Sequence, residues 1–372
     1  MSSYPMKIGT HLAIIVLWLC SIEPLKAETY KVPSEHSSIQ AGLDAAATGD
    51  SVLVAAGTYT GEGNYNLDFA GKNIVLLSED GADSTTIDCE GGDYGIHFQD
   101  DEGRDCVVDG FTIRGADITA IMFKYGASST IINCVLTGNI VGFGCIGESS
   151  CIIEDCLITW NGMSDGAGLY VSHSATPVVK DCVFSGNWSP DVGGAIYIGR
   201  DSSLRLEGCL INGCVADDMG GGIFCGVDAS VFISNCTISG NGALNGGGII
   251  TGGGFVQVEN SAVWGNIGTD IIISNGNAII DCSVLVAPVE WGDSEIEYNG
   301  ESIFSAPLFC DWVNPHDEPT TEGDYQVYSN SPCLPENNPC GIFIGALGVG
   351  CDPPDPTIQR SWGLIKSFYG GR

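Results

Sequence analysis

Apolar and polar residues alternate along the middle of this chain in a pattern that repeats about every 25 residues. One short phrase occurs six times between residues 131 and 266, and weaker copies lie on both sides of it. The copies align on one column, spaced 21 to 27 residues apart: Gly110, Cys134, Cys156, Cys182, Cys209, Cys236, Ser261 and Cys282. A period of this length predicts a solenoid whose coils bury their apolar faces against one another.

A second apolar phrase keeps step with the first, 12 or 13 residues before the aligned column. Its central residues are Ile121, Phe143, Leu169, Ile196, Ile223 and Ile249. Each repeat therefore holds at least two strands joined by Gly, Asn, Asp and Ser, and no repeat has room for a helix. Because strands alternate faces, the aligned column and the residue two places later both point inward and stack on their equivalents in the next coil.

A polar column follows five residues after the aligned one. It consists of Asn139, Asn161, Asn187, Cys214, Asn241 and Asn266. Asparagine tolerates the left-handed backbone conformation and bonds to its own backbone, so this column predicts a tight turn in every coil. The same column is a candidate asparagine ladder inside that turn.

These features resemble the pectate-lyase-like superfamily of β-helix proteins. The phrases FSGN (184–187) and GGAI (193–196) are similar to the FxxN and GGA[IL] repeats of bacterial polymorphic outer-membrane proteins, although most copies here are variants such as ISGN or GGGI. The resemblance implies an all-β fold, a single-stranded right-handed parallel β-helix. It also implies a secreted bacterial protein, either extracellular or associated with the cell surface or outer membrane.

The order of segments predicts three parts of the chain. Residues 1–27 have a basic start, a short apolar core and a candidate cleavage point, which predict a secretory signal peptide. Residues 28–350 form the predicted β-helix, which opens with a short capping helix over residues 39–47 that Ser37 or Ser38 can cap. Residues 351–372 form a Pro-rich linker and tail, and no segment after residue 27 is apolar enough over a sufficient length to cross a membrane as a helix.

The charge of the chain narrows the choice of partners. It has 13 basic and 46 acidic residues, a net charge of −33, and no Lys or Arg between residues 206 and 359. Such a surface repels nucleic acid and anionic lipid, and it disfavours unaided binding of polyanionic glycans. It favours solubility or cation binding instead.

The 17 cysteines need two explanations. Those of the aligned column face inward, where they either stack as reduced thiols, which we favour, or form disulfides between coils ~4.8 Å apart. In the loop-rich C-terminal part we expect one or two disulfides, of open connectivity, among Cys310, Cys333, Cys340 and Cys351. Weaker candidate pairs are Cys145 with Cys151, Cys89 with Cys106, and Cys214 with Cys225.

No residue set carries a recognisable catalytic pattern. We find no polygalacturonase-like series of carboxylates, no pectin-methylesterase pattern beyond the opening segment, and no pectate-lyase-like pairing of carboxylates with an Arg or Lys base. His97 sits in a strand pattern and is interpreted as a structural histidine. Whether the chain is an enzyme stays open, and the sequence favours a non-catalytic protein.

A row of aromatic residues follows the apolar centres by one position. Period 2 turns this row outward and brings Tyr170, Tyr197 and Phe224 together on consecutive coils. The three rings are a candidate binding platform for sugars. The alternative is ordinary stacking between coils, which stabilises a sheet without any ligand.

Acidic residues recur in the turn before the same strand. Asp117, Asp165, Asp191 and Asp218 occupy nearly equivalent positions in their coils. Carboxylates stacked at coil spacing repel one another unless a cation lies between them, so Ca²⁺ is the candidate cofactor of this edge. The alternative is that these aspartates only form turns.

Together these features predict a secreted or cell-surface protein with a non-catalytic role in adhesion or glycan binding. Its partner would be an extracellular polysaccharide or a host or cell-surface protein, and not nucleic acid. A polysaccharide lyase or glycoside hydrolase that uses the same face is the first alternative. A purely structural envelope protein, which would bind no glycan, is the second.

Overall fold

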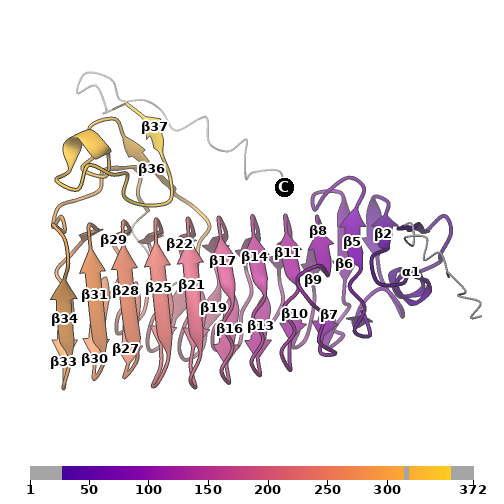
Figure 1. Cartoon of the computed structure of the whole chain (residues 1–372). Helices are drawn as coiled ribbons and strands as arrows, with labels where there is room; N and C mark the ends of the chain where they lie inside the picture. Colours follow the sequence, from indigo (N-terminus) through magenta and orange to yellow (C-terminus); the bar gives the residue numbers. More distant parts are fainter. Residues whose placement is uncertain (1–26, 314–317, 353–372) are drawn as a thin grey trace, which may run out of the picture.

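The computed structural model describes residues 27–313 and 318–352, most of which form an elongated parallel β-solenoid (Figure 1). Three sheets, named A, B and C here, run along it, and successive strands enter them in the order A, B, C. Sheet A has 12 strands, and sheets B and C have 10 each. The solenoid predicted from the repeat is therefore confirmed.

The strands are short because each side of a coil is short. Sheet A consists of β1 (Thr29–Val32), β2 (Ser51–Val54), β5 (Val75–Ser78), β8 (Val107–Asp109), β11 (Thr130–Ile132), β14 (Ile152–Glu154), β17 (Val178–Lys180), β21 (Ser203–Glu207), β25 (Ser230–Ser234), β28 (Phe255–Glu259), β31 (Asn277–Asp281) and β34 (Glu295–Tyr298). Sheet B consists of β3 (Gly57–Tyr59), β6 (Thr85–Asp88), β9 (Thr112–Arg114), β12 (Val135–Thr137), β15 (Leu157–Thr159), β18 (Val183–Ser185), β22 (Leu210–Asn212), β26 (Thr237–Ser239), β29 (Ala262–Trp264) and β32 (Val284–Leu285). Sheet C consists of β4 (Leu67–Asp68), β7 (Tyr94–Phe98), β10 (Thr119–Phe123), β13 (Phe143–Ile146), β16 (Leu169–Ser172), β20 (Ile196–Ile198), β24 (Ile223–Cys225), β27 (Ile249–Gly252), β30 (Ile271–Ser274) and β33 (Val289–Trp291). Between sheets B and C, β19 (Trp188–Ser189) pairs with β23 (Val215–Ala216).

The predicted capping helix is present as α1 (Ile39–Ala45) and closes the N-terminal end of the solenoid. The side chain of Ser38 accepts a hydrogen bond from the Ala41 N–H at 3.3 Å, so Ser38 is the N-cap. Ile39 and Leu43 are fully buried against the first coils, as their spacing predicts. Among the described residues no helix is long and apolar enough to span a membrane.

The cysteine column forms a ladder inside the solenoid. Cys134, Cys156, Cys182, Cys209 and Cys236 are all buried free thiols. The Cys156 N–H donates to the Sγ of Cys182 at 3.4 Å, and further along the Cys209 N–H donates to the Sγ of Cys236 at the same distance. The thiols of Cys182 and Cys236 thus satisfy a backbone donor of the preceding coil as well as filling the core.

Two members of the aligned column are shifted by one residue in the structure. The inward position of the earlier coil is Phe111 and not Gly110, since Phe111 is fully buried and its carbonyl accepts from Val135 N–H. At the other end the inward residue is Ser283, whose hydroxyl accepts from Ser261 N–H at 3.2 Å. Cys282 adopts a left-handed turn conformation with φ 39° and is only half-buried. A slip of one residue exchanges the two faces of a strand, which frees Cys282 for another partner.

The asparagine ladder exists, but its role in the turn differs from the prediction. The side-chain oxygen of Asn161 accepts from the N–H of Asn139, and the oxygen of Asn187 accepts from the N–H of Asn161, each at 3.1 Å. The residue before each asparagine adopts the positive φ that the turn needs; it is a glycine, such as Gly138 or Gly186, except before Asn161, where it is Trp160. The asparagines therefore supply hydrogen bonds to buried backbone groups, and the glycines make the turn.

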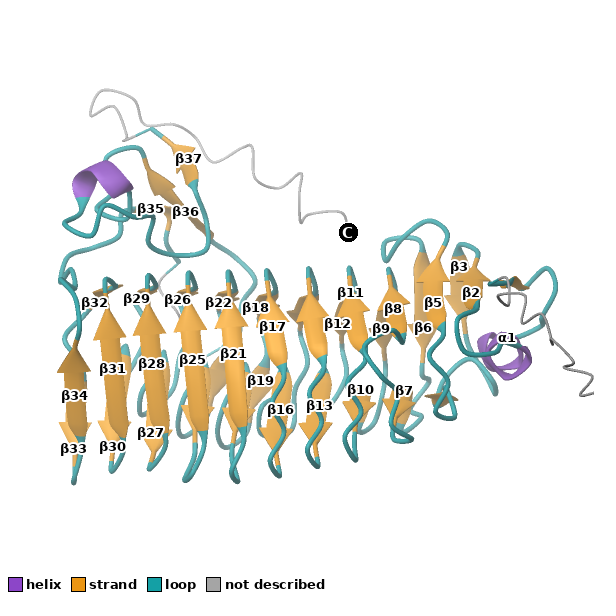
Figure 2. Cartoon of the chain, viewed as in Figure 1, coloured by secondary structure: helices purple, strands orange, loops and turns teal. Residues whose placement is uncertain are grey.

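A small C-terminal module docks on the side of the solenoid (Figure 2). It contains β35 (Phe309–Asp311), β36 (Asp324–Tyr328), β37 (Val349–Cys351) and the 3₁₀ helix η1 (Pro335–Asn337). The strands of sheets A, B and C stop at Tyr298, well short of residue 350, where the sequence placed the end of the β-helix. The module has its own apolar core, which packs on Ala262 and Val284 of sheet B.

Disulfides hold the module in place. Cys282 bonds to Cys340 and joins the solenoid to the module, while Cys310 bonds to Cys351 within it. The expectation of one or two disulfides at this end is confirmed, with Cys282 as an unforeseen partner and Cys333 left as a buried free thiol. The weaker candidate pairs are all free thiols, although the Sγ atoms of Cys145 and Cys151 lie 3.0 Å apart.

Candidate functional site

The three predicted aromatic residues form one stack on the outer face of sheet C. Tyr170 pairs with Tyr197, and Tyr197 pairs with Phe224, on the neighbouring strands β16, β20 and β24. Their ring centroids are 5.0 and 5.6 Å apart, and the rings are parallel to within 7°. All three side chains are half-buried. The structure thus assembles the predicted row, and its role in binding stays a prediction.

Glycines beside the stack allow its rings to lie low on the sheet. A Cβ atom added to Gly199 would lie 2.6 Å from the Tyr197 hydroxyl, and one added to Gly252 would lie 3.2 Å from the Phe224 ring. Burial raises the pKa of the Tyr197 hydroxyl, and the neighbouring Tyr170 and Asp165 raise it further. At neutral pH the stack therefore offers apolar ring surface and phenol groups that can donate hydrogen bonds.

The predicted aspartates lie in the turns before sheet C, but they do not all lie together. The Asp218 N–H donates to the Asp191 carbonyl at 3.0 Å, which places these residues on adjacent coils. The Gly166 N–H donates to the Val192 carbonyl at 3.2 Å, which places Asp165 and Asp191 on adjacent coils as well. Burial raises the pKa of Asp165, and the charge of Asp191 raises it further. Asp117 lies on a different part of the edge, in the wall of a hollow beside Trp160.

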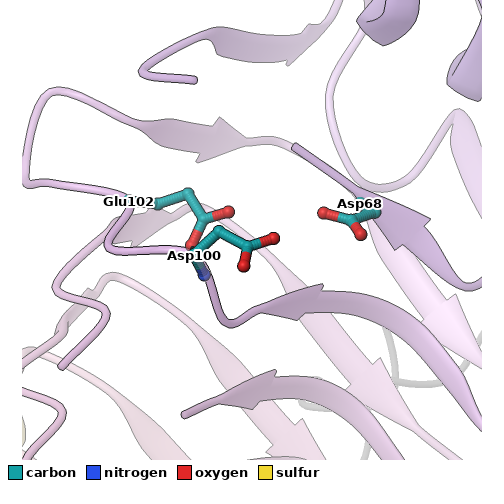
Figure 3. A group of neighbouring side chains, drawn as sticks. All are labelled: Asp68, Asp100 and Glu102. Atoms are coloured by element: carbon teal, nitrogen blue, oxygen red, sulfur yellow. The ribbon is translucent and has the colours of Figure 1, made fainter. Parts of the chain in front are cut away.

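A different acidic group lies near the N-terminal end of sheet C (Figure 3). Oxygen atoms of Asp68, Asp100 and Glu102 lie within 4.8 Å of one another, and they are the one group of three or more His, Cys, Asp or Glu side chains among the described residues that could share a metal ion. The His97 Nε2 lies 3.4 Å from Asp68 Oδ2. Sequence analysis did not assign this group, because its members come from successive coils that precede the clear repeats.

Backbone N–H groups already donate hydrogen bonds to several carboxylate oxygens of this group. Both carboxylate oxygens of the buried Glu102 accept hydrogen bonds, from Gly71 N–H and Asp100 N–H, each at 3.0 Å. Asp68 Oδ1 accepts from Ala70 N–H at 2.7 Å. The oxygen ligands suit a hard divalent cation such as Ca²⁺. However, the group also serves to fix the turns that follow β4 and β7.

The hollow beside Trp160 was not foreseen from the sequence. It has a volume of about 310 Å³ and lies at the corner where the chain passes from sheet B to sheet C. Its lining includes Asp117, Trp160 and Met163, together with glycines that leave its floor open. Half of the Trp160 side-chain area is exposed. The available signal was the Trp in LITWN, where other copies have Gly before the asparagine.

Comparisons with known proteins agree with this fold. The model of the family described as "Right handed beta helix region" matches residues 64–204, 94–263 and 189–287, which together span residues 64–287. No curated protein matches the sequence of this chain at a significant level.

Three solved structures illustrate the likeness. The catalytic unit of the GH87 alpha-1,3-glucanase from Streptomyces thermodiastaticus is 11% identical, with 80% of this chain and 72% of that chain covered and a TM-score of 0.41. A rhamnogalacturonan lyase is 13% identical, with coverages of 77% and 91% and a TM-score of 0.44. The pectin methylesterase from Aspergillus niger is 16% identical, with coverages of 81% and 92% and a TM-score of 0.34. Similarity at these identities concerns the fold alone, whereas the family match spans more than half of the chain. This protein belongs to the right-handed beta helix family.

Proposed function

We propose that this chain is a secreted, non-catalytic glycan-binding protein that acts in adhesion at or near a cell surface. The observation that carries the proposal is the half-buried stack of Tyr170, Tyr197 and Phe224 on sheet C. Aromatic side chains with an apolar body and a polar tip are suited to surfaces that bind partly apolar, partly polar ligands. A sugar ring, with apolar C–H faces and hydroxyl edges, is such a ligand.

The charge beside the stack adds to this chemistry. Asp165 lies close enough to Tyr197 to raise the pKa of its hydroxyl. Carboxylates accept hydrogen bonds from sugar hydroxyls, and they repel uronates and sulfates. We therefore expect neutral or cationic glycans as ligands, and an extracellular polysaccharide or glycosylated surface protein as the partner.

One observation favours the enzymatic alternative. The His97–Asp68 pair, with Asp100 and Glu102 close by, contains groups able to take up and release protons. If the chain is a hydrolase or lyase, this group is where its acid–base chemistry would lie. A binding assay should therefore also test for new reducing ends and unsaturated products.

The stack can be tested by removing its central ring. We expect Tyr197→Ala to weaken glycan binding roughly 10- to 30-fold, the effect of losing about 1.4–2 kcal/mol at an aromatic contact. A matched control is Phe232→Ala, which removes a half-buried ring from sheet A. Binding would be measured on a glycan array and then by calorimetry. Equal affinities for Tyr197→Ala and the parent protein would contradict a role for the stack, and product release would favour the enzyme.

The acidic edge can be tested with calcium. If Ca²⁺ bridges neighbouring carboxylates of Asp165, Asp191 and Asp218, with a Kd near ~1 mM as in extracellular modules, 10 mM Ca²⁺ should stabilise the fold by about 1.4 kcal/mol. We expect the rise in melting temperature to vanish when all three are changed to Asn. The control is Asp68→Asn with Asp100→Asn. Loss of the response only in that control would place the ion in the Asp68 group and contradict binding at the edge.

A further inference from the structure

Trp160 occupies a position that is glycine in the other well-formed coils. Backbone hydrogen bonds run from Gly115 N–H to Gly138 O, from Gly138 N–H to Trp160 O, and from Gly186 N–H to Asn212 O along one column of turns. The glycines of this column are Gly115, Gly138, Gly186, Gly213, Gly240 and Gly265, with φ between 60° and 73°. Trp160 has a backbone φ of 54°, which residues other than glycine rarely adopt.

Stability does not account for this tryptophan. Its backbone conformation is disfavoured for a large side chain, and half of its side-chain area faces solvent. Other residues of the described chain besides glycine also adopt positive φ, but in this column Trp160 is the one that is not glycine, and strained positions of this kind are enriched at functional sites. The ring therefore needs another explanation than packing.

The surroundings of the ring give it one covered and one open side. On the side of the next coil, the Trp160 ring packs over Gly186. A Cβ atom added to Gly186 would lie 3.5 Å from the ring atoms Cδ2 and Cε2. Beyond Gly186 the C-terminal module covers the glycine column, with Thr320 N–H donating to Gly213 O at 2.9 Å. On the other side the ring lines the hollow of about 310 Å³, whose lining also includes Gly115 and Gly138. The missing side chains of these two glycines create the space beside the ring.

We propose that this hollow binds one pyranose unit of a neutral glycan, with an apolar face of the sugar on the indole of Trp160 and a hydroxyl donating to Asp117. The volume lies at the lower end of the ~300–1,000 Å³ range of small-molecule sites, which suits one ring better than a length of chain. Asp117 is the charged residue of the lining, and it disfavours uronates. This inference rests on the proposed glycan-binding function and gives it a second contact, separate from the stack on sheet C.

The test uses Trp160→Gly, which restores the residue found in the rest of the column. We expect the full-length variant to melt at the same or a higher temperature and to bind neutral oligosaccharides at least tenfold more weakly. The probes are cello-, manno-, xylo- and chito-oligosaccharides, with oligogalacturonate as the anionic comparison. The control is Trp291→Ala, which removes a comparably exposed tryptophan from β33 and should leave binding unchanged.

Asp117→Asn tests the charge. It should retain neutral oligosaccharides within a few fold and admit oligogalacturonate, because the amide keeps hydrogen bonding without the negative charge.

The outcomes separate the two proposals. If the parent protein binds none of these probes nor any other glycan on an array, the glycan-binding function is overturned and this subsite with it. If the parent binds and Trp160→Gly binds equally well while Tyr197→Ala does not, the subsite is overturned and the function stands. If Trp160→Gly loses binding and Tyr197→Ala keeps it, the hollow is the glycan contact and the stack is a packing feature.

Discussion

The fold is expected to unfold steeply as the pH rises from about 9 towards 12, while remaining stable near neutrality. Burial raises the pKa of Cys106, Cys214 and Cys225 from an ordinary value of 9.0 to about 12. Below pH 9 these thiols are protonated in both states, so their contribution to stability is fully present. Above pH 9 they ionise only in the unfolded chain, and the contribution is lost as the pH rises towards the folded-state pKa.

The size of this effect comes from the number of thiols. Each such thiol costs about 1.4 kcal/mol of stability per pH unit above 9, so three of them remove roughly 6 kcal/mol by pH 10.5. Domains are commonly stable by only about 5–15 kcal/mol. The ladder thiols Cys134, Cys156 and Cys236 act in the same direction, since burial raises their pKa as well. Circular dichroism against pH, with thiolate absorbance in the same samples, would follow the transition.

Two substitutions provide the control, because each introduces a residue type that already occurs in the same ladder of this chain. Cys214→Asn completes the asparagine ladder, in which the Cys214 N–H already donates to Asn241 Oδ1 at 3.0 Å. Cys236→Ser places a hydroxyl where Ser261 already serves in the next coil by accepting from Cys236 N–H at 3.0 Å. Both changes remove a titrating thiol and keep the hydrogen bonds, so the alkaline midpoint should rise. A midpoint that does not move in the double variant would show that buried thiols do not set the alkaline limit.

The solenoid could be predicted from sequence because its core repeats. Each coil buries equivalent residues on equivalent strands, so alternation and period together give strand positions and facing. The alignment was one residue off at Gly110 and at Cys282, and at Cys282 it followed the cysteine instead of the burial pattern. The structure resolves both positions by placing Phe111 and Ser283 inside. The C-terminal module was not predictable, because its β35–β36 pairing is antiparallel and repeats nothing earlier in the chain.

The candidate sites divide in the same way. The stack of Tyr170, Tyr197 and Phe224 follows from strand alternation and was placed in the right register. The sequence shows that Trp160 replaces the glycine of other copies, but that this position has a positive φ is a property of the backbone, which the structure supplies. The Asp68 group joins residues about 30 positions apart in coils whose spacing is irregular. Sequence therefore located what repeats, and the structure was needed for what departs from the repeat.

Removing the disulfide between Cys282 and Cys340 should destabilise the docked module by about 4 kcal/mol, the loop-closure value for a link that spans 58 residues. The change is Cys282→Ser with Cys340→Ser. Without the link, the module is held by apolar packing on sheet B and by contacts such as the hydrogen bond from Ala346 N–H to Thr237 Oγ1 at 3.0 Å. We expect a lower melting temperature under non-reducing conditions, and faster amide exchange in β26 and β29, which the module covers.

The second disulfide supplies the comparison for that experiment. Cys310→Ser with Cys351→Ser opens a link of similar span, 41 residues, but one that lies within the module. It should loosen β35–β37 while Cys282–Cys340 still keeps the module against the solenoid. Exchange in β26 should then rise less than in the Cys282/Cys340 variant. Equal exchange in the two variants would mean that packing on Ala262 and Val284, and not the covalent link, holds the module on sheet B. The glycine column beyond Gly186 would then stay covered without any disulfide, leaving the Trp160 hollow as the open end of that column in either case.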